Sequence, residues 1–194
     1  MSPNMTVKEL LLKNRSYRRF QQTPIEAATL IELVELTRLC PSAANRQPLR
    51  YLLTCTPVDN AKVFENLSWA GALPDWPGPN ESERPTGYIT ILGDTEVTER
   101  FNVDPGIVAQ SMLLGAVERG LGGCILGSIT RDGLRKSFSI PDRYAILLVI
   151  ALGVPGETVV LEDAKDTNDL DYWRDTADVH HVPKRPLSEL LVEL

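Results

Sequence analysis

Three arginines and a serine lie close together near the start of the chain, and their side chains are well suited to binding an anion. Arg15, Ser16, Arg18 and Arg19 stand within residues 14–20 of an otherwise acidic sequence. A guanidinium is a planar set of donors that can bind two phosphate oxygens at once, and a serine hydroxyl can add a further bond. The plainer interpretation is a solvated surface run that precedes a helix.

A second small basic cluster lies near the other end of the chain. It reads His180-His181-Val182-Pro183-Lys184-Arg185. Two basic clusters at opposite ends of an acidic chain favour one anionic ligand that is held from both sides. Neither cluster alone indicates a binding site. The presence of both favours a binding site rather than two separate solvated surface patches.

Two further segments could contribute to such a site. The polar loop 41–48 carries Ser42, Asn45 and Gln47, which can donate to and accept from the edge of a heterocycle, although ordinary turn formation explains the same residues. The Gly-rich segment 120–128 matches neither a phosphate loop nor a dinucleotide fingerprint. It is typical of a helix end followed by a tight turn, but its backbone N–H groups could also approach a flat ring closely.

Composition limits the class of protein. The 194 residues include 20 Lys and Arg against 26 Asp and Glu, a formal net charge of −6, which argues against nucleic acid or an anionic membrane as the main partner. A hydrophobic content of 43% is incompatible with a disordered chain. The longest apolar run, 145–154, is too short to span a membrane, and residues 1–6 lack a signal-peptide layout, so we expect a cytoplasmic protein.

The sequence offers little for metal binding or acid–base catalysis. Cys40, Cys55 and Cys124 lack metal-ligand spacing and stand among apolar neighbours, so we expect buried, reduced thiols. The two histidines, His180 and His181, are adjacent, which argues against a zinc site and a Ser–His triad. We therefore expect no metal, and we interpret both histidines as residues that dock the tail.

Periodicity and turn residues predict helices that interleave with strands, which indicates an α+β or α/β class and one domain over 1–194. Thr23-Pro24-Ile25-Glu26 reads as a capping box, and Asp104-Pro105 reads as an N-cap followed by Pro at the first helical position. The expected helices are 6–13, 23–40, 57–67, 104–119, 130–138 and 186–194. The expected strands are 50–54, 86–93, 145–154 and a short one within 120–128. Residues 68–85 are expected to be irregular, and their Trp69 and Trp76 could form a substrate lid or packing anchors.

Taken in order, these pieces resemble the FMN-dependent nitroreductase family over nearly the whole chain. The motifs are Arg15-Ser16-Tyr17-Arg18-Arg19-Phe20; Pro41-Ser42 with Asn45, Gln47 and Pro48; Asp104-Pro105-Gly106-Ile107 leading to Gln110; Gly120-Leu121-Gly122 with Leu126-Gly127; Ala151-Leu152-Gly153-Val154-Pro155; and Pro183-Lys184-Arg185-Pro186-Leu187. The resemblance implies an α+β fold with three α-β-α layers, a central, mostly antiparallel sheet flanked by helices, and a domain-swapped-type homodimer with FMN at the subunit interface.

The resemblance also assigns roles to residues. Arg15, Ser16 and Arg18 match the motif that holds the phosphate, the ribityl chain and the pyrimidine edge, and Lys184 with Arg185 matches the basic pair that completes phosphate binding. The loop that reaches the flavin from the other subunit corresponds to Pro41, Ser42, Asn45 and Gln47. The segment against the ring corresponds to Leu126, Gly127 and Ser128. Many relatives carry a basic residue in place of Asn14 and an aromatic one in place of Leu49.

The implied function is an oxidoreductase that passes hydride from NADH or NADPH to nitroaromatic, quinone or similar flat acceptors by a ping-pong mechanism. FMN carries that chemistry, so no catalytic side chain is required. Three alternatives remain open: a specialised flavoenzyme of the same fold, such as a reductive dehalogenase or a flavin-processing enzyme; a binding or regulatory protein without turnover; and a domain whose basic clusters are only surface.

Overall fold

The fold is the expected α+β class. A computed structural model describes residues 5–165 and 168–192. The helices are α1 (Val7–Lys13), α2 (Ala27–Thr37), α3 (Pro57–Phe64), α4 (Asp104–Glu118) and α5 (Arg131–Phe138), with short 3-10 turns at Ala43–Asn45, Glu81–Glu83 and Leu187–Glu189. The strands are β1 (Phe20–Gln21), β2 (Leu49–Thr54), β3 (Gly87–Asp94), β4 (Gly122–Leu126), β5 (Tyr144–Pro155), β6 (Val159–Asp163), β7 (Trp173–Arg174) and β8 (His180–Lys184).

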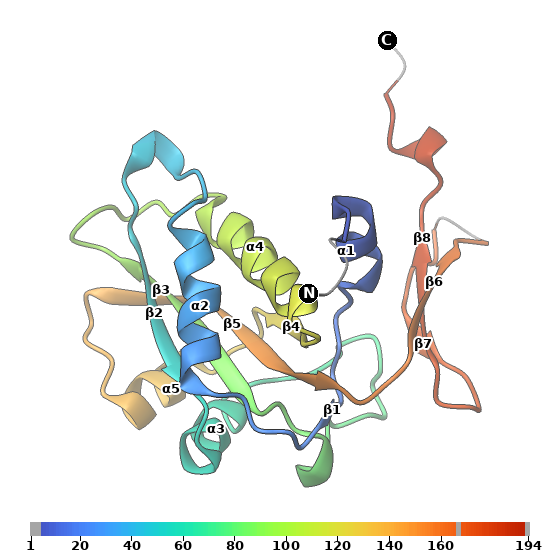
Figure 1. Cartoon of the computed structure of the whole chain (residues 1–194), viewed down its shortest axis with the longest axis horizontal. Helices are drawn as coiled ribbons and strands as arrows, with labels where there is room; N and C mark the ends of the chain where they lie inside the picture. Colours follow the sequence, from blue (N-terminus) through green and yellow to red (C-terminus); the bar gives the residue numbers. More distant parts are fainter. Residues whose placement is uncertain (1–4, 166–167, 193–194) are drawn as a thin grey trace.

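The central sheet is antiparallel and has helices on both faces, as predicted. Its strand order is β1-β5-β3-β2, and β4 pairs with β5 on the side away from β3. Because side chains alternate along a strand, Ile89 and Ile91 of β3 pack against α2 and α4, whereas Tyr88 and Leu92 join the cluster of α3 and α5. The result is three layers, with α2 and α4 side by side over one face (Figure 1).

The helices differ in how they begin, and two predictions about their starts were wrong. α1 begins at the capping box of Thr6 and Glu9, where each residue's backbone N–H is bonded by the other's side chain. The capping box predicted at residues 23–26 does not form, and α2 begins later, after Glu26, whose side chain makes no capping bond. Pro24 and Ile25 precede the helix, and Ile25 is buried in the core.

The start of α4 also differs from the prediction. Val103 is the N-cap, and Asp104 is the first helical residue. The buried Asp104 carboxylate accepts hydrogen bonds from outside the helix, from the Ser42 hydroxyl at 2.6 Å and the Ala43 backbone N–H at 3.1 Å. Asp104 therefore anchors the 41–48 loop to α4 rather than capping the helix.

The chain beyond β5 forms a second sheet that the sequence did not predict. β8 lies between β6, which is parallel to it, and β7, which is antiparallel. This sheet stands beside the main body, and the chain leads away from it toward the C-terminus (Figure 1). The helix predicted at 186–194 was wrong over its described part, where only the 3-10 turn Leu187–Glu189 forms. Residues 193 and 194 lie outside the described residues.

The structure also describes the cysteines, the candidate metal ligands and the apolar helices. All three cysteines are free; Cys124 is buried, but Cys40 and Cys55 are only half-buried because they stand at strand and helix ends. Within residues 5–165 and 168–192, no group of three or more metal-ligating side chains comes together. No helix in those ranges combines the length and the apolar character that a membrane crossing needs.

Gly123 of β4 lies between the arginine-rich stretch and β5. Ser16 forms a β-bridge with Gly123, and the Tyr17 N–H donates to the Gly123 carbonyl at 3.1 Å. A Cβ on Gly123 would lie 2.4 Å from the Ala151 carbonyl oxygen of β5, which is backbone and cannot rotate away. Gly123 is therefore needed for the close approach of β4 to β5.

We expect Gly123→Ala to lower the free energy of unfolding by roughly 1–3 kcal/mol, the usual cost of overpacking a core. Urea denaturation followed by circular dichroism would measure it. Gly71→Ala is the matched control, because a Cβ there would meet no atom within 4 Å. Equal stability of the two variants would contradict the proposed steric requirement.

Candidate functional site

One cavity brings the two basic clusters together, as the sequence predicted. It has a volume of about 370 Å³ and lies between the 14–18 stretch, α4, β4 and the tail. We call it the basic cavity. Its lining residues are Leu11, Asn14, Arg15, Ser16, Arg18, Gln110, Leu113, Ile125, Tyr172, His180, Val182 and Lys184. Arg15, Ser16 and Arg18 thus meet Lys184, although they are far apart in the sequence.

The basic cavity is positively charged because its cations are not neutralised within the protomer. Among the described residues, no carboxylate lies within ion-pair distance of the Arg15 guanidinium, the Arg18 guanidinium or the Lys184 ammonium. Arg15 donates to the Leu11 carbonyl, and its buried Nε has no hydrogen-bond partner among the described residues. Partial burial lowers the pKa of Arg15 without removing its charge. The cavity is therefore suited to an anion.

A buried histidine holds Arg18 in position. Arg18 Nη1 lies 3.2 Å from Nε2 of His180 and 3.3 Å from the Ser16 carbonyl oxygen, and its guanidinium lies 4.5 Å above the centre of the Tyr172 ring. The side chain of His180 is only 1% exposed. Burial, followed by the neighbouring Arg18 charge, lowers the pKa of His180 to about 4. The imidazole is therefore neutral at pH 7, and its Nε2 can accept the bond from Arg18.

Glu157 joins the arginine-rich stretch to the tail, a role that the sequence did not reveal. Its side chain is 2% exposed. One carboxylate oxygen accepts from the backbone N–H groups of Arg18 and Arg19, the latter at 3.0 Å, and the other oxygen lies 2.5 Å from Nη2 of Arg174. Both segments that supply cations to the basic cavity are thus fixed to the same buried carboxylate.

His181, next to His180 in the sequence, lies outside the cavity, and its polar and ring partners all belong to the tail itself. It lies 3.1 Å from Glu162 and 3.4 Å from Asp175, and its ring stacks on Trp173 with centroids 4.1 Å apart. Burial lowers the pKa of His181, but its hydrogen bonds to both carboxylates outweigh this and raise the pKa above the usual value. The surroundings of the two adjacent histidines therefore shift their pKa values in opposite directions.

Several predicted site residues lie outside the basic cavity within one protomer. Arg185 donates to Glu189 at 2.9 Å, and Arg19 pairs with Asp178. Leu126 is buried in the core, and its neighbour Ile125 lines the cavity instead, because alternate residues of β4 face opposite sides. Gly127 and Ser128 follow the end of β4, and both carbonyls accept hydrogen bonds, from Arg131 and Ser68 respectively. The alternation of side chains along a strand is the sequence signal that could have predicted that Ile125 faces the cavity.

The 41–48 loop forms a separate cavity of about 180 Å³, which we call the loop cavity. Pro41, Ser42, Gln47 and Leu49 are among its lining residues. The Gln47 N–H donates to the Ser42 hydroxyl at 3.0 Å, and Gln47 Nε2 donates to Asn45 Oδ1 at 3.0 Å. Asn45 and Gln47 have φ values of 53° and 49°. Left-handed backbone at non-glycine residues is uncommon and is often found at functional sites.

Comparison with known proteins defines the class to which this fold and cavity belong. The family model described as "Nitroreductase family" matches residues 11–154, which is more than half of the chain. The chain therefore belongs to the nitroreductase family of oxidoreductases.

Individual proteins are similar to this chain in sequence or in fold over most of their length. A Methanothermobacter thermautotrophicus protein named "Putative NADH dehydrogenase/NAD(P)H nitroreductase" is 26% identical over 168 residues, which cover 84% of each chain. A nitroreductase family protein of Clostridium difficile 630 superposes with a TM-score of 0.68 at 22% identity, covering 97% of this chain and 98% of the other. An FMN-dependent nitroreductase of C. difficile R20291 superposes with a TM-score of 0.62 at 22% identity, covering 84% and 93%. The structural likenesses show the fold.

Proposed function

We propose that this protein is an FMN-dependent oxidoreductase of the cytoplasm that passes hydride from NADH or NADPH to nitroaromatics, quinones or similar flat electrophiles. The names of the relatives support the reaction class, since they include NAD(P)H nitroreductase and FMN-dependent nitroreductase. The observation that carries the proposal is the basic cavity, in which Arg15, Arg18 and Lys184 lack carboxylate partners among the described residues.

The residues present fit FMN. Its phosphate is an anion that guanidinium and ammonium groups bind, and Arg15, Ser16 and Lys184 would hold it, with Arg185 close in sequence. Arg18 would face the pyrimidine edge, where a fixed positive charge stabilises negative charge on the ring. His180 and Tyr172 keep that guanidinium oriented before a ligand arrives. The orphaned Nε of Arg15 is a further donor available to an anionic ligand.

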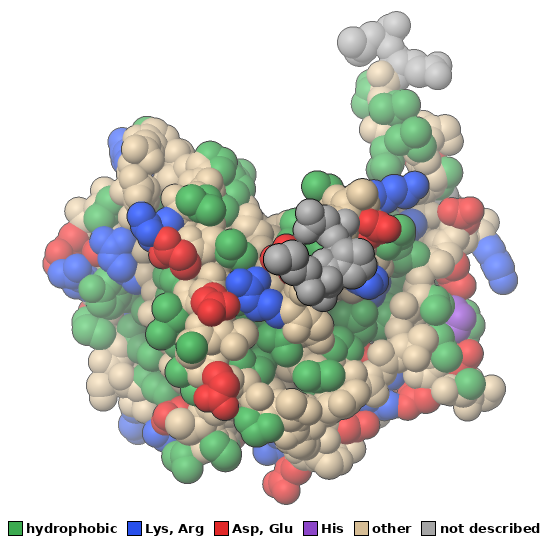
Figure 2. Space-filling model, in the orientation of Figure 1, with side chains coloured by type: hydrophobic (Ala, Val, Ile, Leu, Met, Phe, Trp, Pro, Cys, Tyr) green, Lys and Arg blue, Asp and Glu red, His purple; other side chains and the backbone are tan. Residues whose placement is uncertain are grey.

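We propose that the complete site belongs to a domain-swapped-type homodimer built from one domain per chain. Pro41, Ser42, Asn45 and Gln47 do not line the basic cavity of their own protomer, so they would contact FMN across the subunit interface. Beyond β8, Leu187, Leu190, Leu191 and Val192 are 63–85% exposed. They lie on the arm that projects from the body (Figure 2). A second protomer would cover these apolar side chains.

The protein's part in the reaction is binding and placement. When bound, FMN would supply hydride transfer, first from the nicotinamide and then to the acceptor at the same face of the ring, which defines a ping-pong mechanism. The chain's residues fix the phosphate, set the charge at the pyrimidine edge, and leave Ile125 and Leu113 as apolar walls of the cavity. Gly127 and Ser128, which follow the end of β4, would lie at the ring of the flavin, and Ile125 would contact it in place of the buried Leu126.

The Trp-containing loop gives no support to a specialised flavoenzyme. Trp69 is buried and packs against Phe64 with ring centroids 5.8 Å apart. Trp76 has the guanidinium groups of Arg19 and Arg174 over its ring at 5.7 and 5.3 Å. These contacts favour packing anchors over a substrate lid for both tryptophans.

Steady-state kinetics test the reaction. The initial rate is measured while the concentration of NADH or NADPH is varied at several fixed concentrations of a quinone. Double-reciprocal plots of rate against nicotinamide concentration should then give parallel lines. Intersecting lines would contradict the ping-pong mechanism, and absence of turnover with both donors would contradict the oxidoreductase proposal.

A further inference from the structure

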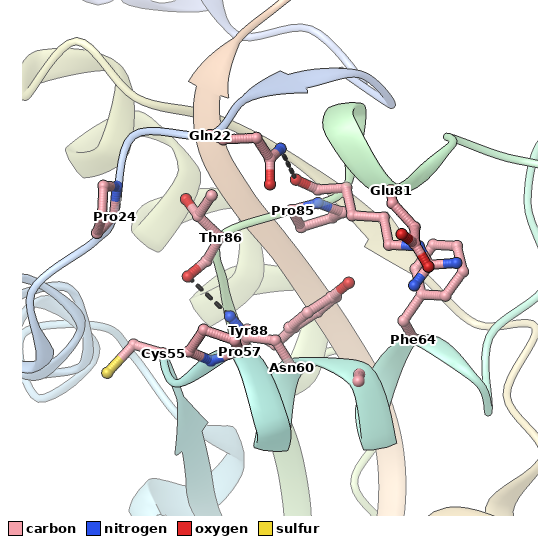
Figure 3. Close-up of a pocket in the computed structure, with 12 residues that line it drawn as sticks. Gln22, Pro24, Cys55, Pro57, Asn60, Phe64, Glu81, Pro85, Thr86 and Tyr88 are labelled. Carbon is pink, nitrogen blue, oxygen red and sulfur yellow. Dashed lines mark hydrogen bonds between the residues drawn. The ribbon is translucent and has the colours of Figure 1, made fainter.

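A second cavity, which we call the proline-lined cavity, lies at the start of β3 and has a volume of about 310 Å³ (Figure 3). Its walls come from α3, from the segment between β1 and α2, and from residues 81–88. It shares no lining residue with the basic cavity or with the loop segment 41–48. None of the residues proposed to bind FMN lines it.

Four buried polar atoms of this cavity's lining residues have no hydrogen-bond partner among the described residues. They are the Tyr88 hydroxyl, Asn60 Oδ1, Thr86 Oγ1 and Arg84 Nε. Tyr88 is only 1% exposed, and Figure 3 shows its side chain among those of the other lining residues. Because buried polar atoms are nearly always bonded, four orphaned atoms around one cavity indicate a ligand with matching polar groups.

The side chains that carry these atoms are already held in place. Asn60 Nδ2 donates to the Thr86 carbonyl at 2.9 Å, and Gln22 Nε2 donates to the Arg84 carbonyl at 3.0 Å (Figure 3). The Arg84 guanidinium lies 4.1 Å from the centre of the Phe64 ring. The amide of Asn60 therefore uses its donor for the protein and keeps its oxygen for a ligand. A site ordered in this way loses little conformational entropy on binding.

The chemistry of the walls defines the ligand. Pro24, Pro57, Phe64 and Pro85 form apolar surfaces that suit a flat hydrocarbon ring. The donors of Arg84 and Tyr88 suit a carboxylate, and the Asn60 oxygen, which only accepts, requires a ligand hydroxyl. We propose that the proline-lined cavity binds a small hydroxylated aromatic acid, separately from the flavin site. Glu81 also lines the cavity, but it is exposed, so water screens its charge.

Calorimetric titration of the purified full chain with 4-hydroxybenzoate tests this proposal. We expect saturable binding that Ala61→Phe abolishes by filling the cavity and that Tyr88→Phe weakens at least tenfold by removing one hydroxyl. Arg15→Ala, in the basic cavity, should leave the affinity unchanged. If excess FMN displaces the probe, or if both Ala61→Phe and Tyr88→Phe bind it normally, the proposed site is wrong. No measurable binding would also overturn it.

The two half-buried thiols supply a readout that needs no variant. Cys55 lines the proline-lined cavity, whereas Cys40 lines the loop cavity. Peptide mass spectrometry after timed alkylation should show that 4-hydroxybenzoate slows the labelling of Cys55 and not that of Cys40. Equal rates at Cys55 with and without the probe would contradict the assignment. Neither measurement depends on flavin binding or turnover, so this proposal and the proposed function can fail separately.

Discussion

Replacing Glu157 with Ala is expected to lower the free energy of unfolding by roughly 3–5 kcal/mol, the usual cost of removing one partner from a buried ion pair. The substitution would leave the Arg174 guanidinium without the carboxylate that lies 2.5 Å from it. It would also remove the acceptor of the Arg18 and Arg19 backbone N–H groups. Urea denaturation followed by circular dichroism measures the loss.

Two variants make this result specific to the buried carboxylate. Glu157→Gln keeps an oxygen acceptor and should lose less stability than Glu157→Ala. Glu35→Ala removes an exposed partner of Arg38 and should change stability by less than about 1 kcal/mol. If Glu157→Ala were as stable as Glu35→Ala, Glu157 would not hold the tail to the arginine-rich stretch.

Replacing Arg15 with Ala is expected to weaken FMN binding by about 10- to 150-fold. A hydrogen bond to a charged group contributes roughly 1.5–3 kcal/mol, and 1.4 kcal/mol corresponds to a factor of ten. Arg15 has no ion-pair partner among the described residues that would compensate its charge. Titration of the flavin-free protein with FMN, followed by flavin fluorescence, gives the dissociation constant.

The matched control for Arg15 is Arg38→Ala, which removes the same type of side chain from an exposed position. Its FMN affinity should equal that of the parent. Circular dichroism should show that Arg15→Ala remains folded, since the side chain makes a single hydrogen bond among the described residues, to the Leu11 carbonyl. Undiminished FMN affinity in folded Arg15→Ala would show that Arg15 does not bind the phosphate.

The parts of the fold that the sequence predicted are those set by local rules. The apolar run of β5 identified a buried strand, and the amphipathic pattern of residues 6–13 predicted α1. The second sheet was missed because β6, β7 and β8 are short and mostly half-exposed, with no apolar alternation to mark them. Their pairing depends on contacts between distant residues, such as Val159 with His180.

Some residues of the candidate site could likewise be predicted from the sequence, and others could not. Arg15, Arg18 and Lys184 could be predicted because their charge is visible in the sequence, and Ser16 because it stands among the arginines; the structure brings all four to one cavity. The partners that position them could not be predicted. His180 accepts from Arg18 and Glu157 accepts from two backbone N–H groups only after the tail has folded back, so neither role has a local sequence signal.

The central claim is that the basic cavity binds FMN, and a visible absorption spectrum tests it most directly. The purified protein, incubated with FMN and freed of excess ligand, is expected to retain about one flavin per chain, identified after release by heat. Its absorption should bleach when NADH or NADPH is added without oxygen. A protein that retains no flavin after this incubation would contradict the account and leave both basic clusters as surface charge.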